Sequence, residues 1–243
     1  MFLEAIKRTN ADEFPASISF EKRDYFSLLM IPLIFLNSFF FARIFHVHGI
    51  YLVLADTAFR GFLFLLICLI YGKMLKEHWK KFNFAKVQSW AVVIIGAIVF
   101  QILITYTRYF LPLYDVKEIL QKENETDVIT FPIILCSFGP VLTAFIEDII
   151  FKYTLLYKLF IKNNIIRFLV VTLNSILFGL VHYYNFDGNL LATIRFMVAG
   201  LFLNLIFLWT RNIWHALLIH IVNNFMLSVI GLLFLYIMQQ FFS

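Results

Sequence analysis

The sequence predicts an all-α, polytopic transmembrane helix bundle with about seven membrane-spanning helices. Of its 243 residues, 62% are hydrophobic and only 14% are charged, which is more apolar surface than a water-soluble domain of this length can bury. The charges lie between apolar runs of about 20 residues, the length that a helix needs to cross a bilayer core about 30 Å thick. These runs are continuous and do not alternate with polar residues, so the pattern does not favour a transmembrane β-barrel.

The elements are expected wherever an apolar run is long enough to cross the bilayer. Residues 1–24 carry charges of both signs and Pro15, which is typical of a cytoplasmic N-terminal segment and not of a cleaved signal peptide. Residues 25–243 then form the membrane domain. Its spans are expected at residues 25–45, 52–71, 87–107, 131–160, 168–182, 190–209 and 213–241. The second span is the weakest because it contains Asp56 and Arg60, whose i,i+4 spacing predicts an ion pair near one interface.

The placement of charges predicts the orientation in the membrane. Basic residues concentrate on the cytoplasmic side, so the five lysines after the second span predict a cytoplasmic loop. They are Lys73, Lys76, Lys80, Lys81 and Lys86. The stretch 108–130 is rich in acidic residues and is expected on the opposite side. We therefore expect a multi-pass protein of the cell membrane with a cytoplasmic N-terminus. Its net charge of +5 indicates contact with membrane lipid and not with nucleic acid, because the basic residues flank apolar spans.

Polar residues inside the predicted spans are candidates for a functional site, because lipid excludes such side chains unless they have a role. They fall in three places, in the fourth, fifth and seventh spans. These places hold Glu147 with Asp148, His182, and His220 with Asn224. Counted along each helix from the nearest basic residue, all three are expected at comparable depth below the cytoplasmic face.

These side chains support two kinds of hydrolytic chemistry. Glu147 in apolar surroundings can act as a general base on water, with a neighbouring imidazole orienting that water. His220 and Asn224 share one helix face and can donate hydrogen bonds to a developing oxyanion. Alternatively, Glu147, His182 and His220 form a His₂Glu set that can bind zinc and leave one position open for water. The residues alone leave both mechanisms open.

Three segments resemble the motifs of a known family. They are Glu147-Asp148-Ile149-Ile150-Phe151-Lys152, Phe178-Gly179-Leu180-Val181-His182 and His220-Ile221-Val222-Asn223-Asn224. Their order, spacing and membrane setting resemble the EExxxR, FxxxH and HxxxN/D motifs of the CPBP (Abi) intramembrane proteases, relatives of the type II CAAX prenyl endopeptidases. The resemblance covers about residues 130–230, which would form a protease-like core.

The resemblance implies a role for each motif residue. No cofactor is expected, with zinc held by Glu147, His182 and His220 as the alternative. Glu147 and His182 would activate water. His220 and Asn224 would stabilise the tetrahedral intermediate. The supporting residues of the site would be Asp148, Lys152 and Phe178.

Two positions depart from the family pattern, since Asp148 replaces the second Glu and Lys152 replaces the Arg. A lysine cannot form the bidentate fork of an arginine, so one alternative is a catalytically inactive scaffold or immunity protein of the same fold. Another alternative is a transporter with an intramembrane proton relay.

The expected function is that of an intramembrane endopeptidase. Its partners would be membrane lipid and a hydrophobic or membrane-anchored peptide substrate, cleaved near the cytoplasmic leaflet in peptide maturation or in bacteriocin self-immunity. This function requires Glu147, His182 and His220 to converge on one polar cavity, which we expect to open to the cytoplasmic side.

Overall fold

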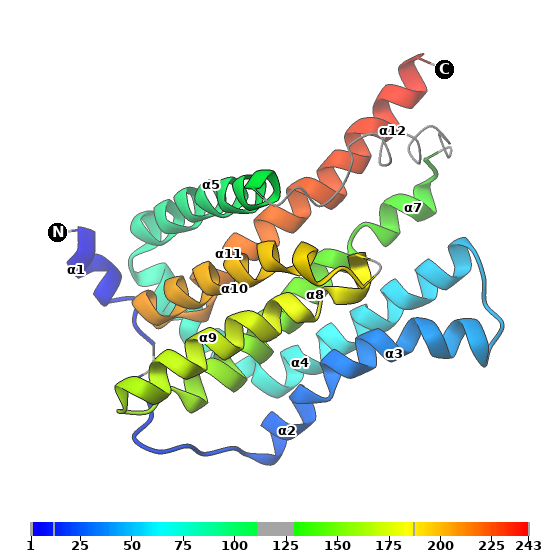
Figure 1. Ribbon diagram of the computed structural model, residues 1–243. Helices are drawn as coiled ribbons and strands as arrows, with labels where there is room; N and C mark the ends of the chain where they lie inside the picture. Colours follow the sequence, from blue (N-terminus) through cyan, green and yellow to red (C-terminus); the bar gives the residue numbers. More distant parts are fainter. Residues whose placement is uncertain (1, 12, 111–128, 187, 243) are drawn as a thin grey trace.

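The computed structural model describes residues 2–11, 13–110, 129–186 and 188–242, and all regular secondary structure in these ranges is helical. The elements in chain order are α1 (Phe2–Lys7), α2 (Lys22–Leu28), α3 (Met30–Arg43), α4 (Ile50–Phe84), α5 (Lys86–Phe110), α7 (Phe131–Cys136), α8 (Gly139–Asp148), η1 (Ile149–Tyr157), α9 (Asn164–Leu180), η2 (Tyr183–Phe186), α10 (Leu190–Thr210), α11 (Ile213–Asn224), η3 (Phe225–Ile230) and α12 (Gly231–Phe242). The elements η1 and η3 are π-helices, and η2 is a short 3₁₀-helix. Figure 1 shows these helices in one bundle, from which α12 extends at the C-terminal end.

Six helical runs in the described ranges are long and apolar enough to cross a membrane. They are Lys22–Arg43, Ile50–Phe84, Lys86–Thr107, Phe131–Tyr157, Leu190–Thr210 and Ile213–Phe241. The expected fifth span corresponds to α9, an apolar helix that is shorter than the others. The prediction of an all-α polytopic bundle is confirmed. The acidic stretch expected at 108–130 lies mostly outside the described residues.

The expectation of a lysine-rich loop after the second span is wrong, because these lysines lie in helices. Helix α4 continues without a break to Phe84, and only Ala85 separates it from α5. The segment after Gly72 contains neither Gly nor Pro, and its apolar residues recur at helical spacing, so one face packs inward. That buried face consists of Tyr71, Met74, Leu75, His78 and Phe82. The lysines lie exposed on the other faces of the same helix.

Asparagine side chains cap the three helices that carry much of the site. Asn163, Asn189 and Asn212 each accept hydrogen bonds from backbone N–H groups in the first turn of α9, α10 and α11, which satisfies donors that a helix start leaves unpaired. Arg211 adopts a left-handed conformation with φ of 47°, which ends α10. Asn212 also donates to the carbonyl oxygen of His78 at 2.8 Å, so the start of α11 is fixed against α4.

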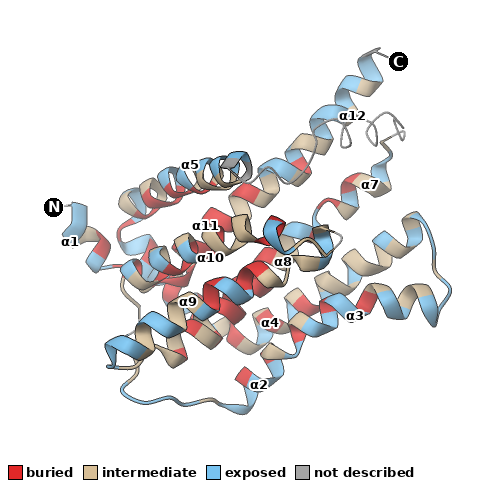
Figure 2. Cartoon of the chain, in the orientation of Figure 1, coloured by how far each residue is buried: buried red, intermediate tan, exposed pale blue. Residues whose placement is uncertain are grey.

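The distribution of exposed residues suits a protein surrounded by lipid. Large apolar side chains lie on the outer faces of the helices, such as Leu69, which is 80% exposed, whereas Asp148 and Lys152 are fully buried. Figure 2 shows buried residues along the inner faces of α8 and α11, at the centre of the bundle. A soluble protein shows the reverse distribution for its charged residues. The polar groups of this protein therefore meet inside the bundle.

Candidate active site

A cavity of about 480 Å³ lies inside the bundle, and the four side chains expected to carry the chemistry all line it. Glu147 comes from the C-terminal end of α8, His182 from the turn after α9, and both His220 and Asn224 from α11. Glu147 is 6% exposed and His220 is 5% exposed. The structure thus brings the three motifs together from three separate helices.

Asp148 and Lys152 form a buried ion pair next to Glu147. The ammonium nitrogen of Lys152 lies 2.6 Å from Oδ1 of Asp148, and neither side chain is exposed. The pair joins the last residue of α8 to the π-helix η1. The same nitrogen lies 4.1 Å from the centre of the Phe178 ring, a distance at which a cation is attracted to an aromatic face. Two favourable contacts therefore hold the lysine that stands where the family motif has an arginine.

The carboxylate of Asp148 also contacts His220. Nδ1 of His220 lies 3.3 Å from Oδ1 of Asp148, and because a carboxylate only accepts, this hydrogen bond places a proton on Nδ1. The amide nitrogen of Asn224 lies 3.5 Å from Nε2 of the same ring and donates to the carbonyl oxygen of Pro140 at 3.1 Å. Asp148 thus orients the ring of His220, while Asn224 stands beside its other nitrogen.

His182 is held by the backbone of the turn that contains it. Its Nδ1 lies 3.0 Å from the carbonyl oxygen of Phe178, so Nδ1 carries the proton of a neutral ring and Nε2 is left as an acceptor. The ring stacks on Phe196 with centroids 4.1 Å apart. Glu147 and His182 line the main cavity and also a smaller one of about 180 Å³ that shares part of its wall.

Phe178 connects the histidines, and two glycines allow it to do so. Its ring centre lies 5.6 Å from that of His220 and 5.7 Å from that of His182. A Cβ atom at Gly200 would lie 2.8 Å from Cδ1 of Phe178, and one at Gly179 would lie 2.8 Å from a backbone nitrogen of α10. Contacts that short do not occur between real atoms of this kind, so the glycines allow α9 and α10 to approach closely. This approach sets the position of both Phe178 and His182.

Asp56 and Arg60 line the cavity from α4, a placement that the sequence analysis did not predict. Their ion pair is confirmed, with Nε of Arg60 at 2.6 Å from Oδ2 of Asp56. Arg60 also donates to Oγ1 of Thr143 at 2.6 Å, and Asn37 donates to Asp56 at 2.9 Å. The sequence contains one sign that these residues belong to the site, which is a pair of opposite charges in an apolar span. Nothing in the sequence shows that this face of α4 packs against α8.

The geometry also bears on the zinc alternative. Among the residues that the structure describes, no three His, Cys, Asp or Glu side chains are grouped so that they could hold a metal ion. Both histidines of the cavity use Nδ1 for contacts with Phe178 and Asp148, so Nε2 is the nitrogen of each ring that is left for water, substrate or a metal ion.

The wall of the cavity extends toward one end of the bundle. Its wall includes Val53 near the start of α4, Cys136 at the end of α7, and Asn185 in the connection between α9 and α10. The start of α4 and the end of α7 lie toward one end of the bundle, whereas η1 meets α9 and α10 meets α11 at the other end (Figure 1). The expected opening on the cytoplasmic side stays a prediction, and the position of these lining residues does not favour an opening at the basic end. Counting along each helix gave the depth of the site but did not show which end of the bundle is closed.

An all-α membrane bundle that encloses a carboxylate, two histidines and an asparagine in one cavity has the composition of an intramembrane hydrolase. Residues 129–226 match the family model of the Rce1-like type II CAAX prenyl endopeptidases, and this match supports the resemblance of this part of the chain to the CPBP family. The match supports, at the level of the family, a CAAX/CPBP-type intramembrane protease. It has no significant match among curated proteins or among solved structures.

Proposed function

We propose that the protein is an intramembrane endopeptidase in which Glu147 and His182 activate water for attack on a peptide bond. The observation that carries this proposal is the shared cavity, since Glu147, His182 and His220 line one space of about 480 Å³ inside an apolar bundle. Ionisable residues in such a setting are costly and are by default functional. The family match supports the same class of reaction.

The proposed reaction uses general acid–base catalysis. The carboxylate of Glu147 takes one proton from water while the water oxygen attacks the carbonyl carbon of the peptide. Nε2 of His182 accepts a hydrogen bond from the other hydrogen and orients the water. Glu147 then passes its proton to the leaving nitrogen as the C–N bond breaks, which yields a new carboxylic acid and a new amine; the acid then loses its remaining proton to water.

His220 and Asn224 are the proposed donors to the oxyanion of the tetrahedral intermediate. When the ring of His220 is protonated, Asp148 balances its charge and Nε2 carries a hydrogen that can point at the oxyanion. The amide nitrogen of Asn224 is only 3.5 Å from that Nε2, so the two donors serve one point of the cavity. Preorganised donors of this kind lower the barrier because they need no rearrangement during the reaction.

The proposed substrate is a hydrophobic or membrane-anchored peptide. The site lies within a bundle whose outer faces are apolar, so a segment that already partitions into lipid reaches it without leaving the membrane. Peptide maturation and self-immunity against a bacteriocin are the two biological roles that we propose for such cleavage.

Complementation of a strain that lacks the gene tests the enzymatic function. We expect wild type to restore the phenotype and Glu147→Gln to fail at equal membrane abundance, because glutamine keeps the shape but cannot accept the proton. Glu77→Gln makes the same chemical change at an exposed position of α4 and is expected to rescue fully. Equal rescue by Glu147→Gln would instead establish a non-enzymatic scaffold or immunity protein.

Metal removal separates the two hydrolytic mechanisms. If Glu147 and His182 activate water without a metal, purified protein retains no stoichiometric zinc and a chelator leaves peptide cleavage unchanged. Metal analysis by mass spectrometry and an activity assay with and without chelator measure this. Stoichiometric zinc, with activity lost on chelation and regained on zinc addition, would assign Glu147, His182 and His220 as ligands.

A further inference from the structure

The two ends of the bundle differ in charge. Basic side chains gather where α4 meets α5, where η1 meets α9 and where α10 meets α11, and Figure 1 shows these junctions at the same end as α1. The residues concerned are Lys73, Lys76, Lys80, Lys81, Lys86, Lys158, Lys162, Arg167 and Arg211. By the positive-inside rule, this end faces the cytoplasm.

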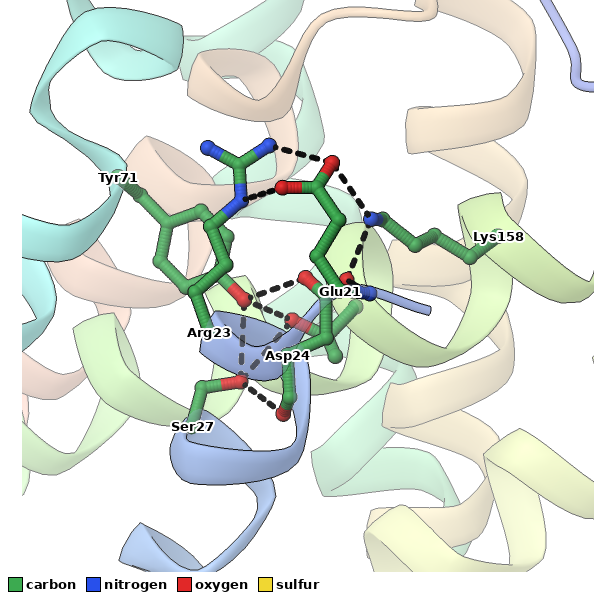
Figure 3. A network of polar contacts seen from close by, with 7 residues as sticks. Glu21, Arg23, Asp24, Ser27, Tyr71 and Lys158 are labelled. Carbon is green, nitrogen blue, oxygen red and sulfur yellow. Dashed lines mark hydrogen bonds and ion pairs between the residues drawn. The ribbon is translucent and has the colours of Figure 1, made fainter. Parts of the chain in front are cut away.

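A buried polar network closes the bundle between this basic end and the cavity. The hydroxyl of Tyr71 donates to Asp24 at 2.9 Å and lies 3.0 Å from the hydroxyl of Thr154. Ser27 contacts both hydroxyls, and Lys158 forms an ion pair with Asp24. Figure 3 shows Asp24, Ser27, Tyr71 and Lys158 pointing toward one another. Lys158 is 7% exposed and the other four are fully buried, so this layer ties α2, α4 and η1 together.

The position of the network along the helices places it on the cytoplasmic side of the site. On η1, Thr154 and Lys158 follow the buried pair of Asp148 and Lys152, and on α4, Tyr71 lies between Arg60 and the lysines. The wall of the cavity continues in the opposite direction, to Val53, Cys136 and Asn185.

We propose that the cavity receives its substrate from the extracytoplasmic side of the membrane. The identity of the substrate rests on the proposed function. Under that function, the substrate is an exported hydrophobic peptide or the extracytoplasmic end of a membrane-anchored peptide. A peptide confined to the cytoplasm would meet the basic end, where the network of Asp24, Tyr71 and Lys158 separates it from Glu147.

The accessibility of a native cysteine tests this proposal in the full-length protein. The chain has two cysteines, and Cys136 lines the cavity, so Cys136 is the only thiol in Cys68→Ser. A charged, membrane-impermeant methanethiosulfonate reagent is added to right-side-out or inside-out membrane vesicles, and modification is followed by the mass of the purified protein. We expect Cys136 to react at least tenfold faster in right-side-out vesicles.

A matched variant reports on the other end of the bundle. In Cys68→Ser/Cys136→Ser/Lys162→Cys, the only thiol is at an exposed position of the basic end, and we expect it to react only in inside-out vesicles. Faster modification of Cys136 in inside-out vesicles would overturn the proposal. So would modification of the Lys162→Cys thiol from the outside, because the basic end would then not be cytoplasmic.

The experiment is independent of catalysis. Cys68→Ser/Glu147→Gln is expected to show the same modification of Cys136 from the outside, whether or not the protein is a protease. A peptide with a hydrophobic stretch and a charged tail, which cannot cross the bilayer, adds the catalytic readout. Glu147-dependent cleavage in right-side-out vesicles supports both proposals. Its absence in both orientations, with Cys136 still modified from the outside, contradicts the protease and leaves the access side established.

Discussion

At the scale of residues, one buried carboxylate organises the candidate site. Oδ1 of Asp148 lies 2.6 Å from the ammonium of Lys152 and 3.3 Å from Nδ1 of His220. Because Asp148 has no exposure to water, its charge depends on these partners. The acidic residue next to Glu147 therefore positions His220 and does not reach the substrate itself.

Removal of the cation should be strongly destabilising. Lys152→Met leaves Asp148 without its ion-pair partner, and breaking a buried pair in this way costs about 3–5 kcal/mol. We predict a clearly lower thermal midpoint for the detergent-solubilised protein, measured by intrinsic fluorescence. Lys162→Met at an exposed position should change stability by no more than about 0.5 kcal/mol. Similar midpoints for both variants would show that the ion pair does not stabilise the fold.

Asn224 should contribute to the rate and not to substrate affinity. Asn224→Ala removes one proposed oxyanion donor, which costs about 3 kcal/mol of transition-state stabilisation and lowers kcat by roughly a hundredfold. KM should stay near the wild-type value, because the donor acts on a charge that develops only during the reaction. Steady-state kinetics with a fluorogenic peptide measure both constants. A raised KM with unchanged kcat would assign Asn224 to substrate binding.

At the scale of elements, the site depends on a π-helix and on close helix packing. The α-helical geometry of α8 changes to the π-helix η1 immediately after Asp148, and such segments occur frequently at functional sites. The last turn of α9 packs against α10 through Gly179 and Gly200. Since Phe178 and His182 follow the position of α9, this packing controls the geometry of the cavity.

A single methyl group at Gly179 tests the role of this packing. Its Cβ would lie 2.8 Å from a backbone nitrogen and 2.9 Å from a backbone oxygen of α10, so the helices must separate. We predict that Gly179→Ala lowers both thermal stability and peptide cleavage. Gly72→Ala, with no atom near its Cβ, should be neutral or stabilising by up to about 1 kcal/mol, because alanine is the better helix former. Equal effects of the two changes would contradict the close approach.

At the scale of the whole molecule, the sequence predicts the fold class and the membrane spans better than the bounds of the helices and their contacts. Apolar runs are sufficient to predict the membrane spans, because each run is a local property of the chain. The continuation of α4 to Phe84 was not predicted, since lysines on an amphipathic helix and lysines in a loop produce the same charge pattern. Motif spacing is sufficient to nominate Glu147, His182, His220 and Asn224.

The rest of the site depends on contacts between distant segments. Arg60 reaches the cavity because one face of α4 packs against α8, and Lys158 closes the opposite end because α2 supplies Asp24. Neither contact has a signature in one sequence. The end of the bundle toward which the cavity extends follows from such contacts, so one sequence does not predict it.

The central claim is that Glu147 directs water to a peptide bond inside the membrane. The most direct measurement is cleavage of a hydrophobic peptide by purified protein in vesicles made up in ¹⁸O-labelled water, followed by mass spectrometry of the products. We predict a new C-terminal carboxylate that contains one ¹⁸O atom with wild type, and at least a hundredfold less product with Glu147→Gln at equal protein. Equal amounts of labelled product from wild type and Glu147→Gln would contradict the account.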